Sequence, residues 1–128
     1  MTRDIITTDR APAAIGPYSQ AVKTQDLVFV SGQLPIDPES GHLVTGDIRN
    51  QTRQAMQNLG AILAAAGSSF DRIVKTTLFI ADMDQFATIN EVYAEFFPGQ
   101  PPSRACVQVA RLPRDAGVEV EAVALHGQ

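Results

Sequence analysis

The sequence has little of what most disulfide, metal and redox sites require. Its 128 residues include one cysteine, two histidines and no tryptophan. The single cysteine, Cys106, excludes an internal disulfide and a cysteine-based zinc cluster. Neither histidine has a second ligand at metal-binding spacing, and the sequence contains no phosphate-binding glycine loop or dinucleotide fingerprint. These residues therefore predict a protein that needs no metal ion and no organic cofactor.

Basic clusters and long apolar runs are also missing. The chain has 10 Lys and Arg against 14 Asp and Glu, a net charge of −4. Because phosphate binding needs clustered Lys and Arg, this charge balance argues against electrostatic binding of nucleic acid. No window approaches the roughly 20 apolar residues of a membrane span, and the N-terminus lacks the apolar stretch of a signal peptide. We therefore expect a cytosolic protein with neither a membrane nor a nucleic acid as partner.

What the sequence does contain is typical of a globular protein. Hydrophobic residues make up 45% of the chain and charged residues 19%, which are ordinary proportions. A chain of this length buries roughly two thirds of its unfolded surface on folding. We found no internal repeat or low-complexity run, so we expect one domain over residues 1–128.

Apolar periodicity predicts the element order β-β-β-α-β-α-β-β. One helix is predicted over 48–66, and a second begins near Asp82 or Asp84 and ends at Pro98. The predicted strands are 4–8, 19–24, 27–32, 73–81, 104–109 and 118–125. Two amphipathic helices must cover one face of one sheet, which gives an α+β fold. The other face is half apolar, so we expect a homo-oligomer.

Arg104 is the unusual residue of the predicted strand over 104–109. Alternation places it on one face with Cys106 and Gln108. An ordinary explanation is an exposed or interface arginine, or one half of an ion pair. The alternative is a carboxylate anchor, because a guanidinium group matches a carboxylate with two parallel hydrogen bonds. The residue alone does not decide between them.

Two glutamates alternate with valines on the last predicted strand. Glu119 and Glu121 could form a solvated strand face, pair with Arg104, or position a water molecule. A glutamate beside an arginine should stay ionised at neutral pH, since a nearby cation favours the charged form. Such a carboxylate would be a weak base and a good acceptor for water.

Several segments together resemble the RidA/YjgF family of reactive-intermediate deaminases, and the match spans nearly the whole chain. They are residues 11–22 (APAAIGPYSQAV), 30–35 (VSGQLP), 64–67 (AAAG), 74–77 (VKTT), 90–93 (NEVY), 96–97 (FF), 102–107 (PSRACV), 112–113 (LP) and 118–122 (VEVEA). Each segment is a weak signal alone, but so many in this order are specific.

The resemblance implies a chorismate-mutase-like fold, a mixed sheet with two helices on one face, assembled as a homotrimer with clefts between subunits. It implies hydrolysis of 2-imino acids such as 2-iminobutanoate and 2-iminopropanoate to 2-oxo acids and ammonia. By the same match, Arg104 holds the substrate carboxylate and Glu119 the attacking water. The matching cleft residues are Tyr18, Ser31, Gly32, Asn90 and Cys106.

The implied reaction suits these residues. A protonated 2-imino acid carries a carboxylate, which Arg104 matches, and an iminium, which Glu119 can stabilise. Imines hydrolyse in water unaided, so positioning and charge placement suffice. Two other functions stay open: a non-catalytic trimer that binds small carboxylates or a protein, and a ribonuclease or translation inhibitor, against which the acidic charge counts.

Overall fold

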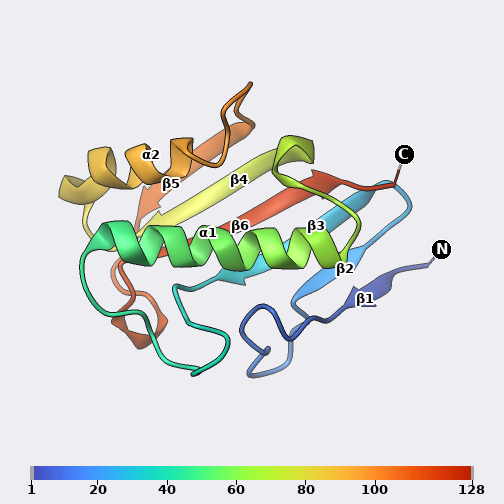
Figure 1. Cartoon of the computed structure of the whole chain (residues 1–128), viewed down its shortest axis with the longest axis horizontal. Helices are drawn as coiled ribbons and strands as arrows, with labels where there is room; N and C mark the ends of the chain where they lie inside the picture. The colour runs from blue at the N-terminus through green and yellow to red at the C-terminus, as the bar shows by residue number, and fades with distance from the viewer. Residues whose placement is uncertain (1, 128) are drawn as a thin grey trace.

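The computed structural model of this chain describes residues 2–127. Its frame is one six-stranded sheet with both α-helices on the same face (Figure 1). The strands are β1 (Asp4–Ile6), β2 (Ala21–Lys23), β3 (Leu27–Gln33), β4 (Ile73–Ile80), β5 (Ser103–Gln108) and β6 (Val118–Leu125), and the helices are α1 (Ile48–Ala65) and α2 (Phe86–Ala94). This is the predicted order, and the α+β class is confirmed.

The sheet is mixed and places the last strand in its interior. The strand order is β1-β2-β3-β6-β4-β5. Only β4 and β5 pair in parallel, because the chain between them crosses over through α2; all other neighbours are antiparallel. β6 therefore lies between β3 and β4, and β5 forms one edge of the sheet.

The core lies between the sheet and the helices. Val118, Val120, Ala122 and Ala124 alternate along β6 and are each at most 4% exposed. They pack with the apolar face of α1, which includes Leu59, Ile62 and Leu63. The intervening β6 residues, Glu119 and Glu121 among them, lie on the opposite face. The predicted two-residue alternation of this strand is confirmed.

The second helix is shorter than predicted at both ends. Asp82 accepts a hydrogen bond from the Asp84 amide, but it caps a 3-10 turn (Met83–Gln85) rather than the α-helix. After Ala94 the next three amides bond to the carbonyls three residues back, so the chain tightens and the α-helix ends before Pro98. None of the helices within residues 2–127 is long and apolar enough to cross a membrane.

The first two strands are also shorter than predicted. The Thr8 amide donates to the Gln20 side-chain oxygen at 2.7 Å instead of extending the ladder between β1 and β2. The 4–8 strand therefore ends at Ile6, and the 19–24 strand is confined to Ala21–Lys23. The residues between them form a long loop that lies against β3.

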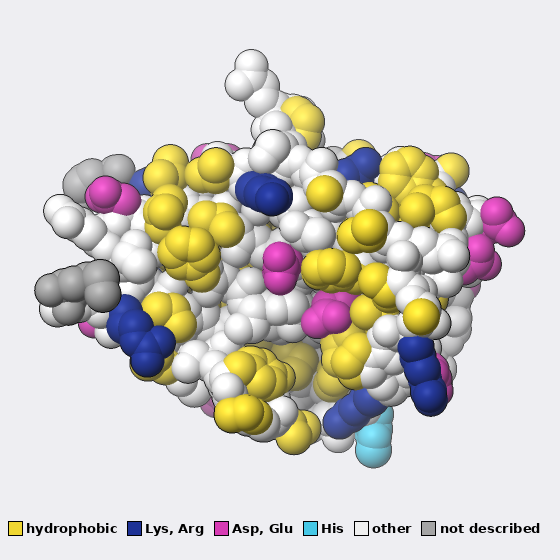
Figure 2. Space-filling model, turned by 180° about the vertical axis from the view of Figure 1, so that it is seen from behind, with side chains coloured by type: hydrophobic (Ala, Val, Ile, Leu, Met, Phe, Trp, Pro, Cys, Tyr) yellow, Lys and Arg dark blue, Asp and Glu magenta, His cyan; other side chains and the backbone are white. Residues whose placement is uncertain are grey.

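The face of the sheet opposite the helices is largely uncovered. Phe29, Val107 and Leu125 point from it and are 46%, 45% and 44% exposed. Figure 2 shows this face, where apolar side chains surround acidic ones near its centre. The half-apolar bare face predicted from the sequence is therefore present.

Candidate functional site

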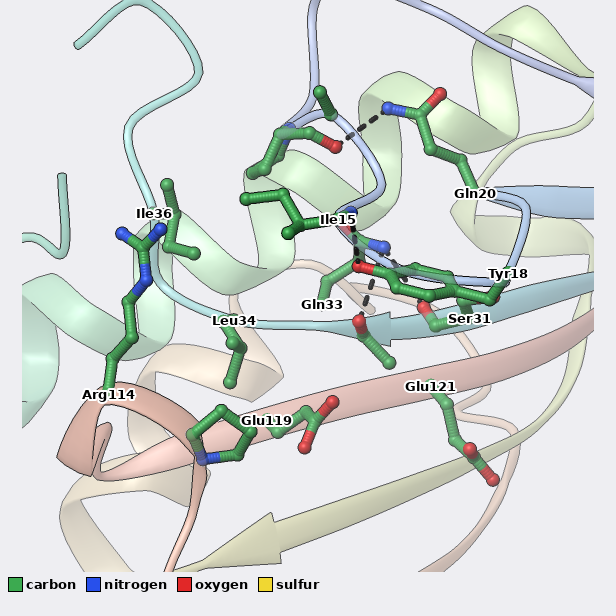
Figure 3. Close-up of a pocket in the computed structure, with 14 residues that line it drawn as sticks. Ile15, Tyr18, Gln20, Ser31, Gln33, Leu34, Ile36, Arg114, Glu119 and Glu121 are labelled. Carbon is green, nitrogen blue, oxygen red and sulfur yellow. Dashed lines mark hydrogen bonds between the residues drawn. The ribbon is translucent and has the colours of Figure 1, made fainter. Parts of the chain in front are cut away.

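Four of the predicted site residues line one hollow of about 600 Å³. Tyr18 comes from the loop before β2, Ser31 and Gly32 from the end of β3, and Glu119 from the start of β6. These segments are far apart in sequence, and the pairing of β3 with β6 brings them together. Figure 3 shows the Tyr18 ring over Ser31, with the Glu119 carboxylate beneath the end of β3.

The Glu119 carboxylate occupies a half-buried position beside a glycine. A Cβ at position 32 would overlap Glu119 Oε2 and lie 2.8 Å from Glu119 Cδ. Glycine at this position therefore makes room for the carboxylate. The ladder between β3 and β6 shifts register between Val30 and Gln33, so the strand is irregular where it approaches Glu119.

Burial raises the pKa of the Glu119 carboxyl, and the nearby Glu121 carboxylate raises it further. Within one chain Glu119 has no arginine beside it, so the condition under which we expected an ordinary ionised carboxylate is not met there. No cation contributes to the shift, because Arg104 lies on the other side of the sheet. A carboxyl group with a raised pKa is a better proton acceptor and donor near neutral pH than an ordinary glutamate.

The loop that carries Tyr18 is held in place by hydrogen bonds from Gln20 and Ser31. Gln20 is 3% exposed, and its side-chain nitrogen donates to the carbonyl oxygens of Thr8 at 3.0 Å and Pro12 at 2.8 Å. The Ser31 hydroxyl donates to the Ser19 carbonyl at 2.6 Å. Ser31 is thus committed to the loop as well as lining the hollow.

Apolar residues form much of the remaining wall, together with Gln33, Arg114 and Glu121. Ile15, Leu34, Ile36 and Pro113 line the hollow, and Ile15 is 75% exposed at its rim. Arg114 follows in a left-handed conformation (φ 58°) and donates to the Gly41 carbonyl at 2.8 Å. Backbone strain of this kind persists only where surrounding contacts fix it.

Arg104 and Asn90 lie together, away from this hollow. The Arg104 Nη1 group donates to Asn90 Oδ1 at 2.7 Å. The guanidinium carbon is 5.0 Å from the centre of the Tyr93 ring and 5.5 Å from that of Phe86. These partners all belong to α2, so Arg104 points to the helix side of the sheet. An ion pair with a glutamate, one of the explanations considered for Arg104, is absent among the ion pairs of residues 2–127.

Cys106 follows two positions after Arg104 on the same face of β5 and is half-buried. Burial raises the pKa of its thiol, and the charge of Arg104 offsets part of that rise. A thiol in this setting is protonated at neutral pH and is a poor nucleophile. Within the described chain, residues 2–127, no group of three or more His, Cys, Asp or Glu side chains is arranged to hold a metal ion.

The predicted site residues therefore form two groups that do not meet within one chain. Glu119 lies on the bare face of β6, and Arg104 lies on the helix face of β5, with β4 between the two strands. Two strand spacings amount to about 10 Å, and the sheet itself separates the side chains. One chain cannot present both groups to the same small molecule.

The sequence model of the family described as Endoribonuclease L-PSP matches residues 8–126. The chain belongs to this family. The 2-iminobutanoate/2-iminopropanoate deaminase of Mus musculus is 52% identical over 125 residues, which cover 98% of this chain and 93% of that protein. The human protein of the same name is 47% identical over 127 residues, which cover 99% and 93%.

Solved structures agree with the family assignment. The YjgF gene product of E. coli is 44% identical, has a TM-score of 0.92, and covers 97% of this chain and 99% of its own. E. coli TdcF, solved with bound serine, is 49% identical, has a TM-score of 0.93, and covers the same shares. The resemblance to the RidA/YjgF family and the fold that it implied are confirmed.

Sequence reasoning missed some contributors to these groups. Nothing in the sequence analysis linked Phe86 or Tyr93 to Arg104. Phe86 is four residues before Asn90, and Tyr93 is three residues after it. This spacing places all three on one face of the helix, which is the signal that they could contact the same side chain. Gln20 gave no such signal, because its role depends on how the loop folds back.

Proposed function

We propose that this member of the RidA/YjgF family hydrolyses reactive 2-imino acids such as 2-iminobutanoate and 2-iminopropanoate to 2-oxo acids and ammonia. The observation that carries the proposal is the Glu119 carboxyl group, half-buried against Gly32 with a raised pKa. Curated relatives about half identical over nearly the whole chain bear the name of this activity, which supports the same conclusion.

Glu119 serves the proton transfers of the reaction. As a carboxylate it takes a proton from water, whose oxygen bonds to the carbon of the protonated imine and gives a carbinolamine. It then returns that proton to the nitrogen and accepts the proton of the new hydroxyl group, so the carbon–nitrogen bond breaks, ammonia leaves and the carbonyl forms. A group that acts as base and then as acid works best with a pKa near the working pH, and the raised pKa of Glu119 moves it in that direction.

Arg104 binds the substrate carboxylate in this scheme. Its guanidinium group is exposed and keeps N–H groups free of Asn90 to donate to an anion. The backbones of Gly32 and Cys106, with Tyr18, Ser31 and Asn90, complete the cleft. The structure supports a contact between Asn90 and the substrate less directly, because the Asn90 amide oxygen already accepts from Arg104.

The complete site lies between two copies of the chain, which assemble as a homotrimer. One copy contributes Glu119 from its bare sheet face, and its neighbour contributes Arg104 from the edge strand β5. The separation of the two groups by the sheet supports this arrangement, and so do the exposed Phe29, Val107 and Leu125 on the bare face. Covering that face would bury apolar surface, which is the usual driving force of assembly.

Three further expectations from the sequence stay predictions. We propose that residues 1–128 form one domain, that the protein acts in the cytosol, and that it does not bind nucleic acid. The net charge of −4 supports the last of these. Cell fractionation and a salt-dependent RNA-binding assay would check them.

The direct experiment generates 2-iminobutanoate from 2-aminobutanoate with an amino-acid oxidase and follows its decay with and without the protein. We expect faster decay with wild-type protein, and a loss of at least about 100-fold in kcat/KM for Glu119→Gln, since general acid–base groups contribute 10²–10⁴-fold. Arg104→Ala should lose activity mainly through KM. No acceleration by the wild type, or full activity in both variants, would overturn the proposal.

The second candidate, a non-catalytic trimer that binds carboxylates, gives a different pattern in the same experiment. It would bind 2-oxobutanoate through Arg104 and leave the decay of the imine unchanged. The placement of Glu119 against Gly32 favours the enzyme, because a simple carboxylate binder has no use for an acidic group with a raised pKa.

A further inference from the structure

The Arg104 side chain does not extend freely from the edge strand. Three residues of α2, Phe86, Asn90 and Tyr93, contact it from one helix face at positions i, i+4 and i+7. The guanidinium carbon lies over both aromatic rings, 5.5 Å from the centre of Phe86 and 5.0 Å from that of Tyr93. Cations at this distance from a ring face are attracted by its electron density.

The Tyr93 ring is itself fixed. Its hydroxyl forms a 2.7 Å hydrogen bond with the hydroxyl of Thr76, which is fully buried. Thr76 on β4 is the register partner of Arg104 on the parallel strand β5. Tyr93 therefore forms a hydrogen bond with Thr76, and its ring lies beneath Arg104, which is the neighbour of Thr76 on the adjacent strand. The ring of Phe97 packs against it with centres 4.8 Å apart, which restricts it further.

We infer that Phe86 and Tyr93 are positioning residues, which hold the Arg104 guanidinium group in the orientation that receives the substrate carboxylate. The inference rests on the proposed role of Arg104. A free arginine on a strand edge samples many rotamers and loses them on binding, which weakens binding. Support from two rings and the hydrogen bond to Asn90 removes most of that freedom in advance.

The inference predicts a difference between two substitutions at one position. Tyr93→Phe keeps the ring beneath Arg104 and loses only the bond to Thr76. Tyr93→Leu keeps an apolar side chain and loses the ring face. Phe70→Leu is the matched control, because Phe70 belongs to the same aromatic cluster but packs at an angle against Phe96 and edge-to-face against Phe97, and it is not among the rings that contact Arg104.

The assays are calorimetric binding of 2-oxobutanoate and turnover of 2-iminobutanoate by the full-length protein. For Tyr93→Leu we expect binding of 2-oxobutanoate about 3- to 30-fold weaker and a similar rise in KM, with kcat within about twofold of wild type. Tyr93→Phe and Phe70→Leu should bind within about twofold of wild type. In an Arg104→Ala background, Tyr93→Leu should cause no further loss, since it acts through Arg104.

Binding equal to wild type in Tyr93→Leu, or equal losses in Tyr93→Phe and Tyr93→Leu, would overturn the inference. If Tyr93→Leu fails to fold, Phe86→Leu at the less buried ring gives the same comparison. Failure of the proposed function is seen separately, as no imine turnover by a wild-type protein that still binds 2-oxobutanoate through Arg104. A wild type that does not bind 2-oxobutanoate overturns the inference itself.

Discussion

Replacing Gly32 with alanine is a sharp test of the Glu119 site, because the change adds one methyl group at a defined place. The new Cβ would overlap Glu119 Oε2 and lie 2.8 Å from Cδ, whereas ordinary contacts are 3.4–4 Å. The carboxylate must therefore move by roughly 1 Å or rotate away. A misplacement of about 1 Å in a reacting group can cost 10²-fold in rate.

The stability cost should be much smaller than the catalytic cost. Gly32 does not have a left-handed φ angle, so alanine meets no backbone strain there. The clashing atoms belong to the flexible end of a half-buried side chain. We expect the free energy of unfolding to change by about 1 kcal/mol or less, as is usual for substitutions that leave the core intact.

The assay is imine turnover beside urea denaturation of the same preparation. Gly99→Ala is the control, because a Cβ at Gly99 meets nothing within 4 Å and that glycine also lacks a left-handed φ angle. We expect Gly32→Ala to lose about 100-fold in kcat/KM while Gly99→Ala stays near wild type. Wild-type turnover in a folded Gly32→Ala protein would refute the idea that this glycine makes room for a reacting carboxylate.

Three more predictions follow from the same structure. Glu119→Gln should be more stable than wild type at pH 7, and the difference in Tm should close as the pH falls. The reason is that a carboxyl group whose pKa is raised by folding binds a proton more readily in the folded chain than in the unfolded chain. The stability of the wild type therefore declines as the pH rises through that pKa. A difference in Tm between Glu119→Gln and wild type that stays constant between about pH 4 and pH 8 would contradict this. Equal amounts of unfolded Glu119→Gln and Arg104→Ala chains, mixed and refolded together, should regain about a quarter of wild-type activity. Random assembly gives about one site in four both an intact Glu119 and an intact Arg104. If the mixture regains no activity, both groups act from the same chain. Gln20→Leu should lower the free energy of unfolding by about 1–2 kcal/mol, since it leaves partly buried carbonyl groups without their donor, and should speed proteolysis of the loop before β2. Unchanged denaturation would show that the loop does not depend on this amide.

Local patterns were enough to predict most of the fold. The apolar spacing of 48–66 predicted α1, and the alternation of valines with Glu119 and Glu121 predicted which residues of β6 lie on each face of the sheet. Two of the errors lie where a side chain accepts a hydrogen bond from a backbone amide. Gln20 ends the first strand pair early, and Asp82 caps a 3-10 turn rather than the helix.

The candidate site was harder to predict than the fold. The family resemblance selected Arg104, Glu119 and the cleft residues, but periodicity alone could not say that the two charges lie on opposite faces. That result depends on β6 inserting between β3 and β4, which is a long-range pairing. The expectation of an ionised Glu119 depended on a neighbouring arginine, which the sheet keeps away within one chain.

The separation of Arg104 from Glu119 by the sheet also prevents one chain from pairing its own two charged groups. A guanidinium and a carboxylate that could reach each other in one chain would form an internal ion pair in every unassembled protomer. Here the two charges can approach each other only across the proposed interface between copies, where the substrate also binds. Within its own chain Arg104 donates to the neutral Asn90, a partner that leaves its positive charge uncompensated until assembly.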